Sequence, residues 1–98
     1  MSHSVRVLPA AEEELSEAWR WYESQRDGLG DEFLMCVEAA IASAARNPEM
    51  YVPVHRSVRR VLTRRFPYGV FFIFEPPAVT VIAIFHASRD SRQWKERT

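Results

Sequence analysis

Residues 70–74 read VFFIF, five consecutive large apolar side chains in a chain of 98 residues. Side chains of a β-strand point alternately to its two faces, so a strand of this composition has to be covered on both sides. Residues 79–86, VTVIAIFH, form a second apolar run, and Pro76 and Pro77 between the two runs predict the turn of a hairpin. The chain therefore needs a sheet with a buried central strand and at least one covering layer.

The covering layer is predicted from the first half of the chain, where apolar residues recur at intervals of three and four. One amphipathic helix is expected over residues 10–26 and a second over residues 31–46, with Asp31 as the N-cap of the second. Residues 27–30, DGLG, supply two glycines for a tight reversal between them. Because this connection is short, the two helices are expected to form an antiparallel hairpin.

Three further segments complete the predicted architecture. Residues 4–8, SVRVL, alternate in character and predict a short first strand, while residues 59–66 predict the first strand of a meander that follows a loop over residues 48–57. Pro67 and Gly69 predict a turn or bulge before the next strand. Residues 1–98 are thus expected to form one α+β domain: a short N-terminal strand, an antiparallel helical hairpin and a three-stranded antiparallel meander (β-α-α-β-β-β), with a short C-terminal tail.

The helical hairpin can cover only one face of this sheet. The chain that is left to cover the other face is the tail from residue 88 onward, in which Trp94 is the one large apolar side chain and is expected to be an anchor. An open apolar face is therefore predicted beside the central strand, and it is interpreted as a docking surface to which Phe72 and Phe74 contribute.

Four arginines, Arg59, Arg60, Arg64 and Arg65, lie within seven positions immediately before the central apolar run. A guanidinium stays charged and grips carboxylate or phosphate groups with paired hydrogen bonds, so the cluster favours recognition of an acidic partner. The alternative is a solvated strand whose charges discourage pairing between sheet edges. Strand alternation predicts Arg59 and Arg65 on one face and Arg60 and Arg64 on the other, and the first pair is favoured as the functional one.

The charges are unevenly distributed, although the formal net charge is zero. Residues 1–49 carry ten acidic and four basic side chains, whereas residues 50–98 carry three acidic and nine basic ones. An electrostatically two-sided molecule is expected.

The sequence predicts no disulfide, metal site or membrane segment. Cys36 is the only cysteine, so no intrachain disulfide is possible, and no Cys/His spacing predicts a metal site. No signal-like or membrane-spanning apolar run is present in the sequence, which predicts a cytoplasmic protein.

Three segments, read together with this order of elements, resemble the RelE/ParE superfamily of bacterial toxins. They are WRWYESQRDGLGDEF (residues 19–33), the RR…RRFPYGVFF run (residues 59–72) and AIFHASRDSRQWKER (residues 83–97). The resemblance implies the toxin of a type II toxin–antitoxin system, held in a hetero-oligomer by a cognate ParD-like or RelB-like antitoxin. It implies no cofactor and no membrane partner.

The superfamily contains two activities, and the resemblance leaves both open. A ParE-like toxin would bind a host target, with DNA gyrase implied, whereas a RelE-like toxin would cleave mRNA on the ribosome. A third reading is an inactive member that binds only its antitoxin. No tyrosine follows Tyr68, the net charge is zero and Lys95 is the only lysine, and these features favour the ParE-like reading.

If the chain is a nuclease, Arg65, His86 and Arg89 are the catalytic candidates, because RNA cleavage needs a base, an acid and cations near the phosphate. The structural alternative for His86 is a strand-end histidine bonded to a neighbouring carbonyl. The residues predicted to bind the target or the antitoxin are Arg59, Arg60, Arg64, Arg65, Phe72, Phe74, His86, Arg89 and Trp94.

Overall fold

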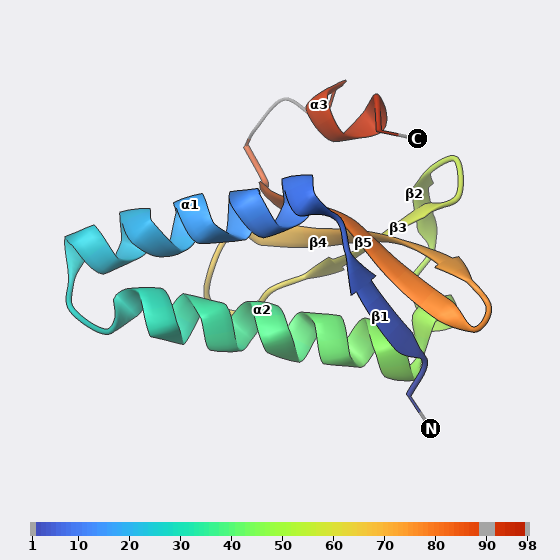
Figure 1. Cartoon of the computed structure of the whole chain (residues 1–98), viewed down its shortest axis with the longest axis horizontal. Helices are drawn as coiled ribbons and strands as arrows, with labels where there is room; N and C mark the ends of the chain where they lie inside the picture. Colours follow the sequence, from blue (N-terminus) through green and yellow to red (C-terminus); the bar gives the residue numbers. More distant parts are fainter. Residues whose placement is uncertain (1, 89–91, 98) are drawn as a thin grey trace.

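The computed structural model describes residues 2–88 and 92–97. A helical hairpin lies across one face of a twisted sheet, and the short last helix lies apart from the hairpin (Figure 1). The elements follow in the order β1 (Ser4–Val7), α1 (Pro9–Gln25), α2 (Leu29–Arg46), the 3₁₀ turn η1 (Pro48–Met50), β2 (Pro53–His55), β3 (Val58–Leu62), β4 (Tyr68–Glu75), β5 (Ala78–His86) and α3 (Arg92–Lys95).

The strands form one five-stranded sheet in the order β1-β5-β4-β3-β2. β1 pairs with β5 in parallel, whereas β2 to β5 pair antiparallel in sequence order. The α+β class, the helical hairpin and the meander are confirmed, and β4 is the central strand. The prediction of a loop over residues 48–57 is wrong, because this segment contains η1 and the edge strand β2. A strand of three residues is too short for a two-residue period to be recognised in the sequence.

The hairpin turn is held by a carboxylate of α1. Glu23 accepts hydrogen bonds from the backbone N–H groups of Gly28 and Gly30, at 2.9 and 3.0 Å. Gly28, with φ of 88°, is the N-cap of α2, which begins at Leu29, two residues earlier than predicted. The prediction that Asp31 is the N-cap is therefore wrong. Asp31 instead lies inside α2, where its carboxylate accepts a hydrogen bond from Trp19 Nε1 at 3.0 Å.

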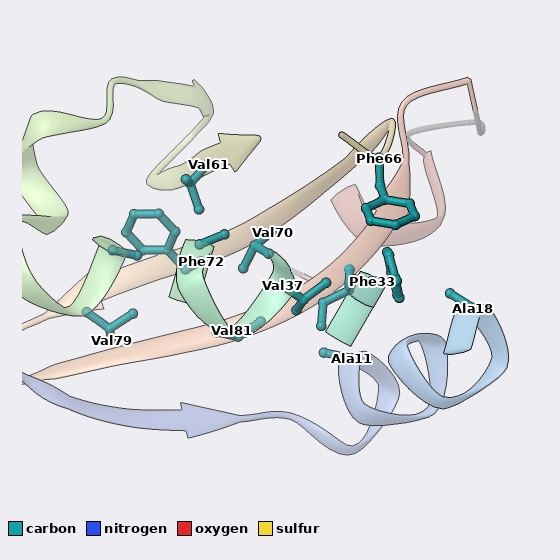
Figure 2. Packing of buried hydrophobic residues seen from close by; sticks show 13 residues of the cluster. Ala11, Ala18, Phe33, Val37, Val61, Phe66, Val70, Phe72, Val79 and Val81 are labelled. Atoms are coloured by element: carbon teal, nitrogen blue, oxygen red, sulfur yellow. The ribbon is translucent and has the colours of Figure 1, made fainter. Parts of the chain in front are cut away.

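The main core lies between the hairpin and the sheet (Figure 2). Phe33 and Val37 of α2 are completely buried, as are Phe72 of β4 and Val81 of β5. The spacing of four residues between Phe33 and Val37 places both on one helix face, and the alternation of the strands brings their partners to the same layer. Burial of this layer is what fixes the hairpin on the sheet.

The centre of the opposite face of the sheet is covered by residues 92–97, chiefly by Trp94. The indole of Trp94 stacks on Phe71 with ring centroids 4.3 Å apart, in a cluster that also contains Val58, Ile82 and Phe85. All five residues are at most 6% exposed. The predicted anchor role of Trp94 is confirmed. The predicted open apolar face is wrong for this cluster, because the indole covers it, but Val54 and Leu62 in the hollow beside Trp94 stay 41% and 59% exposed.

Candidate functional site

The strand predicted over residues 59–66 ends at Leu62. Residues 63–67 form a turn in which the Thr63 hydroxyl donates to the Phe66 carbonyl at 2.7 Å, and the Thr63 N–H donates to the Tyr68 carbonyl at 3.0 Å. Arg65 has a positive φ of 70°, so side chains do not alternate through the turn. The prediction that strand parity separates Arg64 from Arg65 is therefore wrong.

The other two arginines do lie in β3, on opposite faces. Arg59 points to the helical side, where its guanidinium donates to the backbone carbonyl of Tyr51. Arg60 points to the side of Trp94 and is exposed. An internal hydrogen bond thus engages Arg59, whereas Arg65 lies in the turn and contacts Glu32. Their action as one functional pair stays a prediction.

An aromatic cluster positions the arginine-bearing turn. The ring of Phe66 is 8% exposed and packs edge-on against Tyr22 of α1 and Phe33 of α2, with centroids 4.9 and 5.3 Å apart. Burial raises the pKa of the Tyr22 hydroxyl, and the neighbouring Tyr68 adds to the effect. Because Phe66 is fixed in the core, the two preceding side chains project from a rigid position.

Arg64 and Arg65 line a groove of about 650 Å³ between α2 and β3, which we call the arginine groove. Arg46 at the end of α2 is a third cation along its rim. Met35 and Leu62 are 68% and 59% exposed, which makes them unusually accessible apolar side chains in this groove. Its lining consists of Glu32, Met35, Cys36, Ala39, Ala40, Ser43, Arg46, Tyr51, Val61, Leu62, Arg64 and Arg65.

Glu32 ties Arg65 to the helical hairpin. One carboxylate oxygen lies 2.7 Å from Arg65 Nη2 and the other 2.9 Å from Arg26 Nη2. These two hydrogen bonds, from Arg65 first and then Arg26, lower the pKa of the Glu32 carboxyl. The same contact raises the pKa of Arg65. Within the described part of the chain no acidic side chain pairs with Arg64 or Arg46, so the groove keeps a net positive charge.

His86 lies at the end of β5, away from the arginine groove. Its Nδ1 accepts the N–H of Ser88 at 3.0 Å, and the Ser88 hydroxyl lies 2.7 Å from the same atom. The expected bond to a carbonyl is therefore replaced by bonds to Ser88. His86, Arg60 and Lys95 line a hollow of about 250 Å³ over the face covered by Trp94. Arg65 lines a different hollow, so the structure does not bring Arg65 and His86 together as one catalytic pair, and Arg89 lies outside the described residues.

Three apolar residues predicted to bind a partner have structural roles. Phe72 is completely buried in the main core, and Trp94 is 4% exposed. Phe74 is half-buried against the core and its ring lies 4.8 Å from that of His3. Their assignment to a docking surface is wrong for Phe72 and Trp94, because the main core buries one and the tail's own packing buries the other.

The sequence reading missed the contribution of α2. Met35, Ala39, Ser43 and Arg46 follow one another at intervals of four, four and three residues, so they share a helix face, and all four line the arginine groove. Small residues repeated at this spacing outside the buried stripe are the signal that could have indicated a groove. The described residues contain no group of three acidic, histidine or cysteine side chains that could hold a metal ion. They also contain no helix with the length and apolar character needed to cross a bilayer.

Comparison with known proteins identifies a family and a fold for this chain. The ParE toxin of type II toxin–antitoxin systems, parDE, is the family whose sequence pattern matches residues 5–91. No curated protein sequence matches the chain. Among solved structures, the chromosomal ParDE system from P. aeruginosa superposes with a TM-score of 0.75 at 12% identity, over 89% of this chain and 98% of that chain. The toxin–antitoxin complex RelBE2 from Mycobacterium tuberculosis superposes with a TM-score of 0.62 at 17% identity, over 88% and 99% of the two chains.

The two structural similarities establish the fold. The family match extends over most of the chain and includes the arginine-bearing turn, strands β2 to β5 and all of β1 except Ser4. The helical hairpin, the central strand and the Arg64–Arg65 turn all fall inside the matched region. This chain belongs to the ParE toxin family of type II toxin–antitoxin systems.

Proposed function

We propose that this protein inhibits bacterial growth by binding DNA gyrase and is neutralised by a cognate antitoxin. The observation that carries the proposal is the family match over residues 5–91, because it includes every element that builds the arginine groove. The similarity to a ParDE system and to a RelBE2 complex supports an antitoxin as the partner. The residues that would meet this partner follow from the chemistry of the groove.

The arginine groove suits an amphipathic segment with acidic residues on one side. Met35 and Leu62 expose apolar surface that a partner's apolar side chains can bury, and the small residues Ala39 and Ser43 allow a close approach to α2. Arg64, Arg65 and Arg46 would donate hydrogen bonds to carboxylates around this apolar contact. An antitoxin tail of this composition would therefore satisfy both the apolar and the charged parts of the groove.

A RelE-like mRNA endonuclease is the second candidate. One observation favours it: Arg60, His86 and Lys95 line the same hollow, and cations beside a histidine are a combination that RNA cleavage can use. Against it, Nδ1 of His86 is engaged by Ser88, Arg65 lies in another hollow, and no tyrosine follows Tyr68. Gyrase binding is accordingly the proposed activity.

Controlled expression in a bacterial host separates the readings. A gyrase poison should arrest growth, produce DNA breaks and induce the SOS response while bulk mRNA stays intact. Co-expression of the neighbouring gene's product, which we expect to be the antitoxin, should restore growth. Codon-phased mRNA cleavage in a translating extract that is lost in His86→Ala would establish the nuclease instead. A chain that binds the neighbouring product without arresting growth would be an inactive, antitoxin-binding member.

A further inference from the structure

A cleft of about 590 Å³ lies between α1 and the ends of β4 and β5, and the proposed antitoxin contact does not use it. We call it the α1 cleft. It lies on the α1 side of the helical hairpin, whereas the arginine groove lies on the α2 side. The side chains that give it its chemistry are Glu14, Glu17, Trp21, Tyr22, Tyr68 and His86.

Aromatic rings form the apolar part of this cleft. Trp21 is 59% exposed, although it is the largest side chain on α1 besides Trp19. Its indole meets the ring of Tyr22 edge-on, with centroids 5.0 Å apart and planes at 83°, so it has a packed neighbour that restricts its position. An exposed tryptophan beside a cleft is the residue type that most often dominates the free energy of protein–protein binding.

Two carboxylates border the same rings. Glu14, Glu17 and Trp21 are spaced by three and four residues, so they lie along one face of α1. Carboxylate oxygens together with aromatic faces form the environment that a guanidinium or an ammonium group prefers, because the charge is neutralised while the stem and the cation pack on a ring.

Arg97 of the chain's own C-terminal segment already binds one of these carboxylates, Glu14. Arg97 Nη2 lies 2.8 Å from Glu14 Oε2, and Nη1 lies 3.1 Å from Oε1 and 3.0 Å from the Ile82 carbonyl. The Arg97 guanidinium also lies 5.8 Å from the centroid of the Phe85 ring. Glu17, one turn further along α1 and exposed, has no such cation among the residues that the structure describes.

We propose that the α1 cleft binds an arginine or lysine side chain from a basic segment of the host protein that this toxin inhibits. Glu17 accepts the hydrogen bonds of the cation, and the rings of Trp21 and Tyr22 pack against its stem. The inference rests on the proposed function, which supplies the host protein as the source of that segment. The antitoxin is less suited than the host protein to supply this basic side chain, because an acidic segment suited to the arginine groove would be repelled by the carboxylates of the α1 cleft.

Charge reversal of Glu17 tests the proposal in the full-length chain. Glu17→Arg should require at least tenfold more protein for the same growth inhibition, since a charge-assisted contact is replaced by repulsion. Affinity for the neighbouring gene's product should stay unchanged. Glu12→Arg makes the same change at an exposed position of α1 outside the cleft and not one helical turn from Glu17, and it should behave like the unmodified chain. Full toxicity of Glu17→Arg, or loss of antitoxin affinity instead of toxicity, would overturn the proposal.

If the unmodified chain does not inhibit growth, the proposed function is refuted but the cation site of the α1 cleft is not. A direct binding measurement tests this site independently of growth inhibition. The probe is acetylated tetra-arginine amide, with tetra-glutamate as its control, and the readout is the NMR signal of the Trp21 indole N–H, assigned with Trp21→Phe. The arginine peptide should shift this signal, and Glu17→Gln should weaken its binding at least tenfold while Glu12→Gln does not. No shift, or equal binding by both variants, would contradict a cation site.

Discussion

The indole of Trp94 lies on the ring of Phe71, with planes inclined by 27° and centroids 4.3 Å apart. This contact joins the C-terminal segment to the central strand and covers the centre of the second face of the sheet. Both rings are almost completely buried, at 4% and 6% exposure. Residues 92–97 are therefore part of the folded domain, although most of them are polar.

Trp94→Ala should lower the free energy of unfolding by roughly 3–5 kcal/mol, the usual cost of truncating a buried tryptophan. The measurement is equilibrium unfolding in urea followed by circular dichroism. Trp21→Ala is the matched control, because it makes the same truncation at an exposed position and should cost roughly 1 kcal/mol or less. Equal effects of the two substitutions would show that the tail does not stabilise the domain.

Gly30→Ala should destabilise the protein, although alanine is ordinarily the better residue inside a helix by roughly 0.5–1 kcal/mol. An added Cβ would lie 2.8 Å from the Trp19 carbonyl oxygen and 2.9 Å from Glu23 Oε1, so α1 and α2 would have to separate. The expected cost is roughly 1–3 kcal/mol, with a changed NMR signal of the Trp19 indole.

Gly28→Ala is the comparison for this substitution. Its Cβ would have no neighbour within 4 Å, and only the positive φ of 88° would be unfavourable. It should leave the Trp19 indole signal in place. A Gly30→Ala variant as stable as the unmodified chain would contradict the close helix contact.

Glu32→Gln should reduce the loss of stability in acid. The folded-state pKa of Glu32 is lowered by Arg65 and Arg26, so its stabilising contribution is present above the ordinary value of 4.5 and is lost as the pH falls through the lowered pKa. The thermal midpoint of the unmodified chain should therefore drop more between about pH 5 and pH 3 than that of the variant. High salt should reduce this difference between the two thermal midpoints, because the Arg65–Glu32 ion pair is partly exposed. Glu38→Gln, an exposed carboxylate on the same helix, should leave the acid transition unchanged.

Arg64→Gln combined with Arg65→Gln should weaken binding of the antitoxin by about a hundredfold or more, through the loss of two charge-assisted contacts. Titration calorimetry with the neighbouring gene's product is the measurement, with thermal unfolding recorded in parallel. The matched control is Arg6→Gln with Arg20→Gln, which removes two exposed guanidinium groups outside the arginine groove. Unchanged affinity in the Arg64/Arg65 variant would assign the antitoxin to another surface.

The periodicity of the sequence was sufficient to predict the order of the main elements. Over long segments, a helix face repeats every three to four residues and a strand face every two. The stripe with Phe33 and Val37 and the run with Phe72 thereby predicted the hairpin, the central strand and their common core. Short elements gave no such signal. β2 has three residues, and β5 carries an extra residue, Ile82, at a bulge between the partners of Phe71 and Phe72, a position that no glycine or proline marks.

The four arginines predicted to bind a partner show most clearly what the sequence alone cannot predict. Their number, their order and their position before the central strand are properties of the sequence alone, and so is the separation of acidic and basic halves. Which of them share a surface was decided by the tertiary structure: the positive φ of Arg65 ends the strand alternation, and burial of Phe66 holds the turn beside α2. Backbone reversal and packing against a distant helix depend on contacts more than thirty residues apart, such as that of Arg65 with Glu32, and local patterns carry no information about contacts of that range.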